Sequence, residues 1–135
     1  MKKLVATILL ISMVIALAQP AFAAEIAQIQ PYYADAGDIE VSLTISNNGT
    51  ATIRATCMGD SNVTSVNLTV YLQKKVGTSW VTVSGCTWSA TNLSRCFSKS
   101  YSASVSGSGE YRAVGYFYIT ATSTSTESAT SYASY

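Results

Sequence analysis

The sequence contains no histidine and only three cysteines. Without histidine, neither a Ser–His–Asp triad nor a Cys–His pair can be built. No Cys-x-x-Cys spacing occurs, so a zinc centre would need three widely separated thiolates, and we expect no metal site. Asp35 and Asp38 leave a surface calcium site open, although aspartates near the start of a strand are more often turn formers.

Paired acids and clustered bases are also lacking. A glycosidase needs two carboxyl groups about 5–10 Å apart in a cleft, whereas the acids lie on different predicted strands and turns: Glu40, Asp60, Glu110 and Glu127. Charged residues are 11% of the chain, and the lysines and arginines do not form the clusters that nucleic acid or anionic lipid requires. We therefore expect no enzyme, no cofactor and no nucleic-acid partner.

The N-terminus has the pattern of a signal peptide. Lys2 and Lys3 precede an apolar run over residues 4–17, and the A-x-A site at residues 21–23 follows. The run is too short for a spanning helix, so we expect cleavage after Ala23, secretion to the extracellular space and no membrane insertion. The predicted organisation is a signal peptide (residues 1–23), a leader (24–37) and one β-domain (38–135).

The domain alternates apolar and polar residues with the period of a half-buried strand. Seven strands are predicted, at residues 38–46, 50–57, 66–75, 79–84, 95–102, 110–120 and 126–133. Val66, Leu68, Val70 and Leu72 point inward in the third. Val81 and Val83 point inward in the fourth, with Trp80 outward, although the opposite phase would bury Trp80.

Asn47-Asn48-Gly49 separates the first two strands, and the alternation selects its turn type. A two-residue turn would place the two apolar sets on opposite faces. A three-residue loop pairs Ile45 with Ala51 and keeps one buried face. We therefore predict a three-residue hairpin with Gly49 in a left-handed bulge.

Seven short strands in about 95 residues indicate a sandwich or barrel. The stretch "GEYRA" places Tyr111 just after a turn and resembles the tyrosine corner of immunoglobulin-like domains. This resemblance implies an all-β, seven-stranded immunoglobulin-like antiparallel β-sandwich, with three strands (first, second, fifth) facing four, as in fibronectin type III domains. An up-and-down β-barrel is the alternative.

At larger scale the chain resembles an uncharacterised family of small exported proteins from Gram-positive bacteria. The residues that carry this are "PYY" in the leader, "LTISNNGTATIRATC", "YLQKK" followed by "SWVTV", and "GEYRA" before an aromatic strand. The resemblance covers nearly all of the predicted mature chain and implies no activity.

Export would place the cysteines where disulfides form. Cys57 lies in phase with Ile53 and points inward, and Ala113 stands where an immunoglobulin domain has the partner cysteine. We expect a disulfide between Cys86 and Cys96, at the ends of the connection between the fourth and fifth strands. A bridge that uses Cys57, or three free thiols, are the alternatives.

One predicted surface is rich in aromatic residues. Tyr71, Tyr116 and Tyr118 point outward from the four-stranded sheet, and Trp80 and Arg112 share this face, with Asn67 and Gln73 beside them. Rings with amide and guanidinium donors suit sugars, and they equally suit a protein partner. Two structural alternatives remain: the tyrosines stabilise cross-strand pairs, or the leader covers them.

The leading hypothesis is therefore a secreted, non-catalytic binding module for a cell-wall or environmental glycan, or for a protein partner. The alternatives are a secreted antimicrobial or toxin-like factor and a structural protein that self-associates through open sheet edges.

We predict that the exported protein begins at Ala24, because the A-x-A site directs cleavage there. Intact-mass spectrometry of secreted material measures this directly. A secreted species that retains residues 1–23 would contradict the signal-peptide interpretation and the oxidising compartment inferred from it.

Overall fold

A computed structural model describes residues 37–135 of the protein. The predicted signal peptide and the leader up to residue 36 lie outside these residues. Seven strands fill the described range: β1 (Asp38–Ile45), β2 (Thr50–Met58), β3 (Ser65–Val76), β4 (Ser79–Leu93), β5 (Cys96–Ser104), β6 (Glu110–Thr120) and β7 (Thr124–Ser134). The described residues contain no helix, and hence none that could span a membrane.

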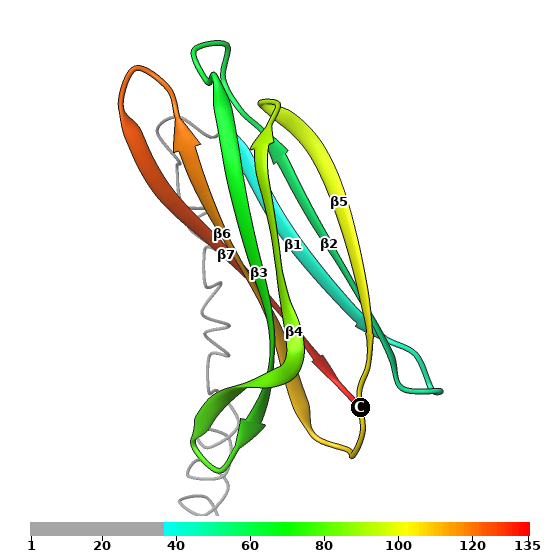
Figure 1. Cartoon of the computed structure of the whole chain (residues 1–135). Coiled ribbons are helices and arrows are strands. Elements are labelled where there is room, and N and C mark those ends of the chain that lie inside the picture. Colours follow the sequence, from blue (N-terminus) through cyan, green and yellow to red (C-terminus); the bar gives the residue numbers. More distant parts are fainter. Residues whose placement is uncertain (1–36) are drawn as a thin grey trace, which may run out of the picture. The chain divides into compact units, whose positions relative to one another are not determined.

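The strands form two antiparallel sheets, one with the order β1-β2-β5 and the other with the order β4-β3-β6-β7 (Figure 1). This is the partition that the immunoglobulin-like prediction gave, so the seven-stranded β-sandwich is confirmed. The alternative of a single closed sheet is wrong, because the strands divide between two separate sheets.

The first hairpin has the predicted register. Ile45 lies opposite Ala51, and Ile39 lies opposite Cys57. The Ser46 amide donates to the Thr50 carbonyl over 3.0 Å, and Gly49 has a φ of 79°. A Cβ atom at Gly49 would also lie 2.8 Å from the Val105 carbonyl oxygen. Both the left-handed backbone and this close approach therefore favour glycine.

The core fills the space between the sheets. Val66, Leu68, Val70 and Leu72 of β3 are almost completely buried, as predicted. Leu68 lies opposite Phe117 of β6, and the Phe117 ring stacks on Phe97 of β5, with centroids 6.2 Å apart. The aromatic pair thus joins the two sheets through the middle of the sandwich.

The tyrosine corner is present. Tyr111 is 1% exposed at the start of β6. Its hydroxyl donates to the backbone carbonyls of Ser106 and Gly107, which are 2.9 and 2.8 Å away. The ring is buried while its polar atom is satisfied, and this fixes the turn that leads into β6.

The fourth strand differs from the prediction. β4 does not end at residue 84 but continues to Leu93, after a register shift that leaves extra β4 residues between Thr82 and Thr87. Gly85, in this bulge, has a φ of 74°. The bulge allows the start of β4 and the end of β3 to bend away from the other sheet (Figure 1).

This bend explains a wrong prediction for one of two valines. Val83 is half-buried and packs against the core, in line with its predicted inward position. Val81 is 51% exposed, so its predicted burial is wrong. It pairs with Lys74 and lines an open cleft with Val76 and Val105, because the hairpin end projects past the packed interior.

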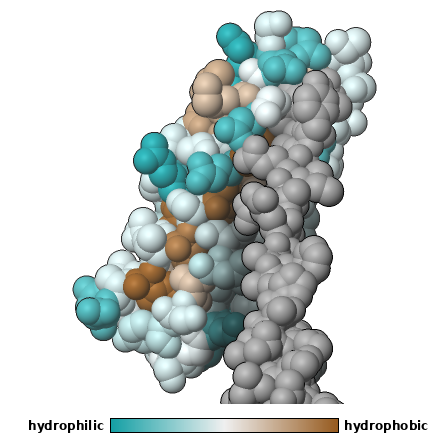
Figure 2. Space-filling model, turned by 180° about the vertical axis from the view of Figure 1, so that it is seen from behind, coloured by the Kyte–Doolittle hydropathy of each residue, from teal (hydrophilic) through white to brown (hydrophobic). Residues whose placement is uncertain are grey.

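The side of the protein shown in Figure 2 is mostly weakly polar. On the side shown in Figure 2, pale residues predominate, and strongly hydrophilic and strongly hydrophobic ones form scattered spots. Alternating serine and threonine on the outward positions accounts for such a surface. The sheets therefore reach solvent mainly through hydroxyl groups rather than charges.

The two sheets approach closely at Gly115 of β6. A Cβ atom there would lie 2.7 Å from Val41 Cγ2 and 3.2 Å from the Phe117 ring. Val41 belongs to β1 and is buried, and its branched side chain has little rotamer freedom. Glycine at this position therefore sets how near β1 and β6 can pack.

We predict that Gly115→Ala lowers the free energy of unfolding by about 1–3 kcal/mol, because the added methyl group overpacks the core. Urea denaturation measures the change. The double variant Val41→Ala/Gly115→Ala should lose less stability than the sum of the two single variants, because the shortened side chain makes room. A Gly115→Ala protein as stable as the wild type would contradict this close approach.

Candidate ligand-binding face

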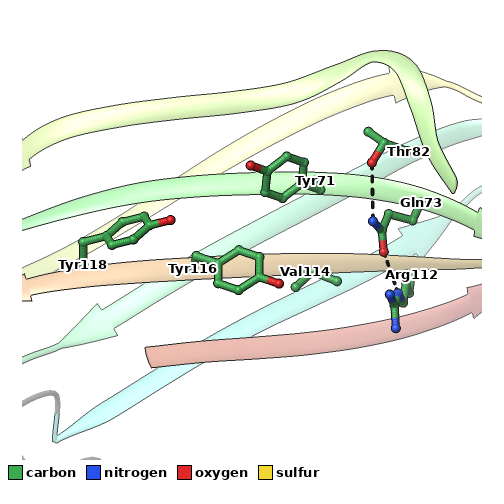
Figure 3. A pocket seen from close by; sticks show the side chains of 7 residues that line it. All are labelled: Tyr71, Gln73, Thr82, Arg112, Val114, Tyr116 and Tyr118. Atoms are coloured by element: carbon green, nitrogen blue, oxygen red, sulfur yellow. Dashed lines mark hydrogen bonds between the residues drawn. The ribbon is translucent and has the colours of Figure 1, made fainter. Parts of the chain in front are cut away.

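The outward residues of the four-stranded sheet surround a cavity of about 330 Å³. We call this surface the aromatic face; its lining residues are Tyr71, Gln73, Thr82, Arg112, Val114, Tyr116 and Tyr118 (Figure 3). Thr82 comes from β4, and the other six alternate with the core residues of β3 and β6, so their side chains point away from the sandwich interior. Four of the five residues predicted from the sequence are thus brought together.

Three tyrosines form one end of the aromatic face. Tyr116 and Tyr118 are 38% and 42% exposed, and Tyr71 is half-buried. The rings of Tyr71 and Tyr116 meet edge to face, with centroids 6.0 Å apart and planes at 81°. Tyr118 makes no aromatic ring contact within residues 37–135. Cross-strand stacking therefore accounts for two of the rings and leaves the third unexplained.

A polar row crosses the other end. Arg112 Nε donates to Gln73 Oε1 over 2.7 Å, and Gln73 Nε2 donates to Thr82 Oγ1 over 3.4 Å (Figure 3). The three residues are direct neighbours on adjacent strands, since Gln73 lies opposite both Arg112 and Thr82. The row fixes the orientation of the amide and leaves the Nη groups of Arg112 outside these two bonds.

Trp80 lies beside this row but does not line the cavity. It is half-buried and lies outward, as predicted, and it pairs with Lys75 of β3. The Arg112 guanidinium carbon is 4.6 Å from its ring centroid, and the Tyr132 ring is 5.8 Å away. The indole is thus an underlying support for Arg112 rather than an open platform for a ligand.

Gln73 was expected beside the predicted site residues, but three other residues of this region were not expected there. Thr82 and Val114 line the cavity, and Tyr132 of β7 covers Trp80. Tyr132 could have been identified, since it is the aromatic residue in the outward phase of the last strand. Asn67, by contrast, does not reach the cavity, because its side-chain oxygen accepts a bond from the Asn92 amide.

The predicted disulfide between Cys86 and Cys96 is not formed, and all three cysteines are free. The prediction placed Cys86 at the end of its strand. Instead β4 continues for seven residues beyond it, which at about 3.3 Å per residue separates Cys86 from the β4–β5 connection by roughly 20 Å. A disulfide requires Cα atoms within about 7 Å, so the longer strand excludes the bridge.

The environments of the three thiols differ. Cys57 is 1% exposed, as the inward prediction required, while Cys96 is exposed. Burial raises the pKa of the Cys57 thiol to about 11, with smaller contributions from the nearby Cys96 and Asp38. Burial also raises the pKa of Cys86. Both buried thiols therefore stay protonated and unreactive near neutral pH.

Acidic and cysteine side chains are scattered in the part of the chain that the structure describes. Within residues 37–135, no three side chains of cysteine, aspartate or glutamate gather where they could hold a metal ion. The ion pair between Lys75 and Glu110, with N and O 2.6 Å apart, lies on the exposed surface. What the aromatic face offers is hydrogen-bond donors, hydroxyl groups and exposed rings.

We predict that iodoacetamide at pH 8 alkylates Cys96 rapidly in the folded protein and alkylates Cys57 and Cys86 only after denaturation, because their thiols are buried and protonated. Peptide mapping without reductant gives the sites and any linkage. A linked peptide that joins Cys86 to Cys96 would show that β4 ends early, as the sequence suggested.

Comparison of the chain with protein families, with curated proteins and with solved structures finds no match. The resemblance to small exported proteins of Gram-positive bacteria therefore stays a prediction.

Proposed function

We propose that the protein is a secreted, non-catalytic binding module that holds a glycan on the aromatic face. The observation that carries this is the cavity itself, in which three tyrosine rings stand next to a hydrogen-bonded row of guanidinium, amide and hydroxyl groups. A sugar ring has apolar C–H faces and a rim of hydroxyl groups, so it needs both kinds of surface. Binding sites commonly combine an aromatic lining with a few placed polar groups.

Tyr118 supports a binding role over a purely structural one. A tyrosine that stabilises a sheet does so through contact with a cross-strand neighbour. Tyr118 lies opposite Asn67 on β3 and Thr126 on β7, and neither neighbour is aromatic. Its 42% exposure leaves ring surface open to a ligand.

The chemistry of the surroundings favours a glycan over a protein partner. Protein interfaces use the same anchors, namely tyrosine, tryptophan and arginine, but they surround them with further contacts that exclude water. Here Val114, an aliphatic residue in the lining, is 7% exposed and lies beneath the surface. The accessible groups are phenols, amides and hydroxyls, which are the partners that sugar hydroxyl groups require.

We predict that the double variant Tyr116→Ala/Tyr118→Ala loses retention on the glycan, while its fold survives. The test measures retention of the protein on insoluble peptidoglycan and on a panel of insoluble polysaccharides. Each exposed cross-strand aromatic contributes only about 0.2–1 kcal/mol to stability. Phe117→Ala, which truncates a core ring, should cost about 3–5 kcal/mol.

Tyr135→Ala is the matched control. Tyr135 is 38% exposed, like Tyr116, but its ring lies against Gly49 in the turn of the other sheet. This variant should bind as the wild type does. Undiminished retention of the folded double variant would place the binding site elsewhere, and a stability loss of the Phe117 size would show that the tyrosines are buried by another part of the chain.

A further inference from the structure

We infer that the glycan carries carboxylate groups and that Arg112 binds them. This inference rests on the proposed function of the aromatic face. Among residues 37–135, Arg112 is the one basic residue that lines the cavity, and no acidic residue of this range lines it. The cavity is therefore positively charged in a domain with few charges. The complementary ligand is an acidic sugar, such as a uronic acid.

Arg112 is held ready for an anion. Its Nε–H donates to Gln73 Oε1 at 2.7 Å, and its guanidinium carbon lies over the Trp80 ring, 4.6 Å from the ring centroid. These two contacts hold the guanidinium in place and do not involve its Nη1 and Nη2 atoms. Those atoms present two parallel N–H donors, the geometry that a carboxylate accepts in a bidentate pair.

The charges nearby do not neutralise Arg112. Lys75 also approaches Trp80, but it pairs with Glu110, so that these two charges cancel. No carboxylate forms an ion pair with Arg112 within residues 37–135. A half-buried guanidinium without a counter-ion gains more from an ionised ligand than from a neutral hydroxyl group, because a carboxylate adds the attraction between opposite charges and accepts two N–H bonds at once.

Another arginine on the opposite sheet shows the contrast. Arg54 also lines a surface cavity and donates its Nε–H, to Ser98 Oγ at 2.9 Å. Its cavity, however, contains Glu40 and no aromatic side chain. Arg54 thus has an acid of the protein beside it, whereas Arg112 has rings and an amide.

The spacing indicates a chain of sugars rather than one. Arg112 and Tyr116 are four residues apart on β6, which is about 13 Å along the strand. This exceeds the width of one sugar ring. One unit can therefore place its carboxylate on Arg112 while a neighbouring unit lies against Tyr116 and Tyr71.

The test compares polygalacturonate with its fully methyl-esterified form, which keeps the sugars and masks the carboxylates. We predict that the wild-type protein binds the acid about ten- to a hundredfold more tightly, the range expected for a hydrogen bond to a charged group. Arg112→Gln should abolish this difference while weak binding to both polymers remains. Arg112→Lys keeps the positive charge but lacks the two parallel N–H donors of the guanidinium, so it should retain part of the preference for the acid polymer.

Arg54→Gln is the matched control, since it removes a surface arginine of equal charge from the other sheet. If Arg54→Gln reduced the preference for the acid polymer as much as Arg112→Gln does, the inference would be overturned. Equal binding of acid and ester by the wild type would also overturn it. Both results would leave the proposed glycan binding in place. Tighter binding of a teichoic acid, which carries phosphate in place of carboxylate, would overturn the inference as well. Absence of binding to every polymer would overturn the proposed function and, with it, the inference.

Discussion

The pairing of β3 with β6 is the constraint on which both the core and the aromatic face depend. It runs from Ser65 opposite Thr120 to Lys74 opposite Tyr111 without a register shift. A slip of one residue would exchange the two faces of a strand, turning buried apolar residues such as Leu72 to solvent. Burial of the inward side chains of β3 and β6 therefore also fixes the positions of the outward side chains that line the cavity.

Much of the fold could be predicted because the alternation in the sequence is regular where a strand has one buried face. The register of the first hairpin and the inward set of β3 followed from it. The alternation was less informative in β4, where the inward residues after the bulge are Cys86, Trp88 and Ala90, a small and mixed set. The disulfide between Cys86 and Cys96 was predicted from their spacing along the chain. This prediction failed because spacing along the chain does not define the distance between two Cβ atoms.

The candidate site was predictable to the same degree and for the same reason. Alternation tells which face a residue occupies, and it correctly placed Tyr71, Arg112, Tyr116 and Tyr118 together. It does not tell which residues of other strands lie alongside. The positions of Thr82 next to Gln73 and of Tyr132 next to Trp80 depend on the bulge in β4 and on the register of the last strand.

The two tryptophans occupy very different surroundings, and this makes them separate optical reporters. Trp80 lies among charged groups at the edge of the cavity, whereas Trp88 stacks on Tyr101, with centroids 5.3 Å apart and planes at 18°. Trp88 packs against the core, so its fluorescence follows the separation of the sheets. Trp80 senses the charge and hydration around Arg112, so the emission of the native protein contains one signal from folding and another from the surface.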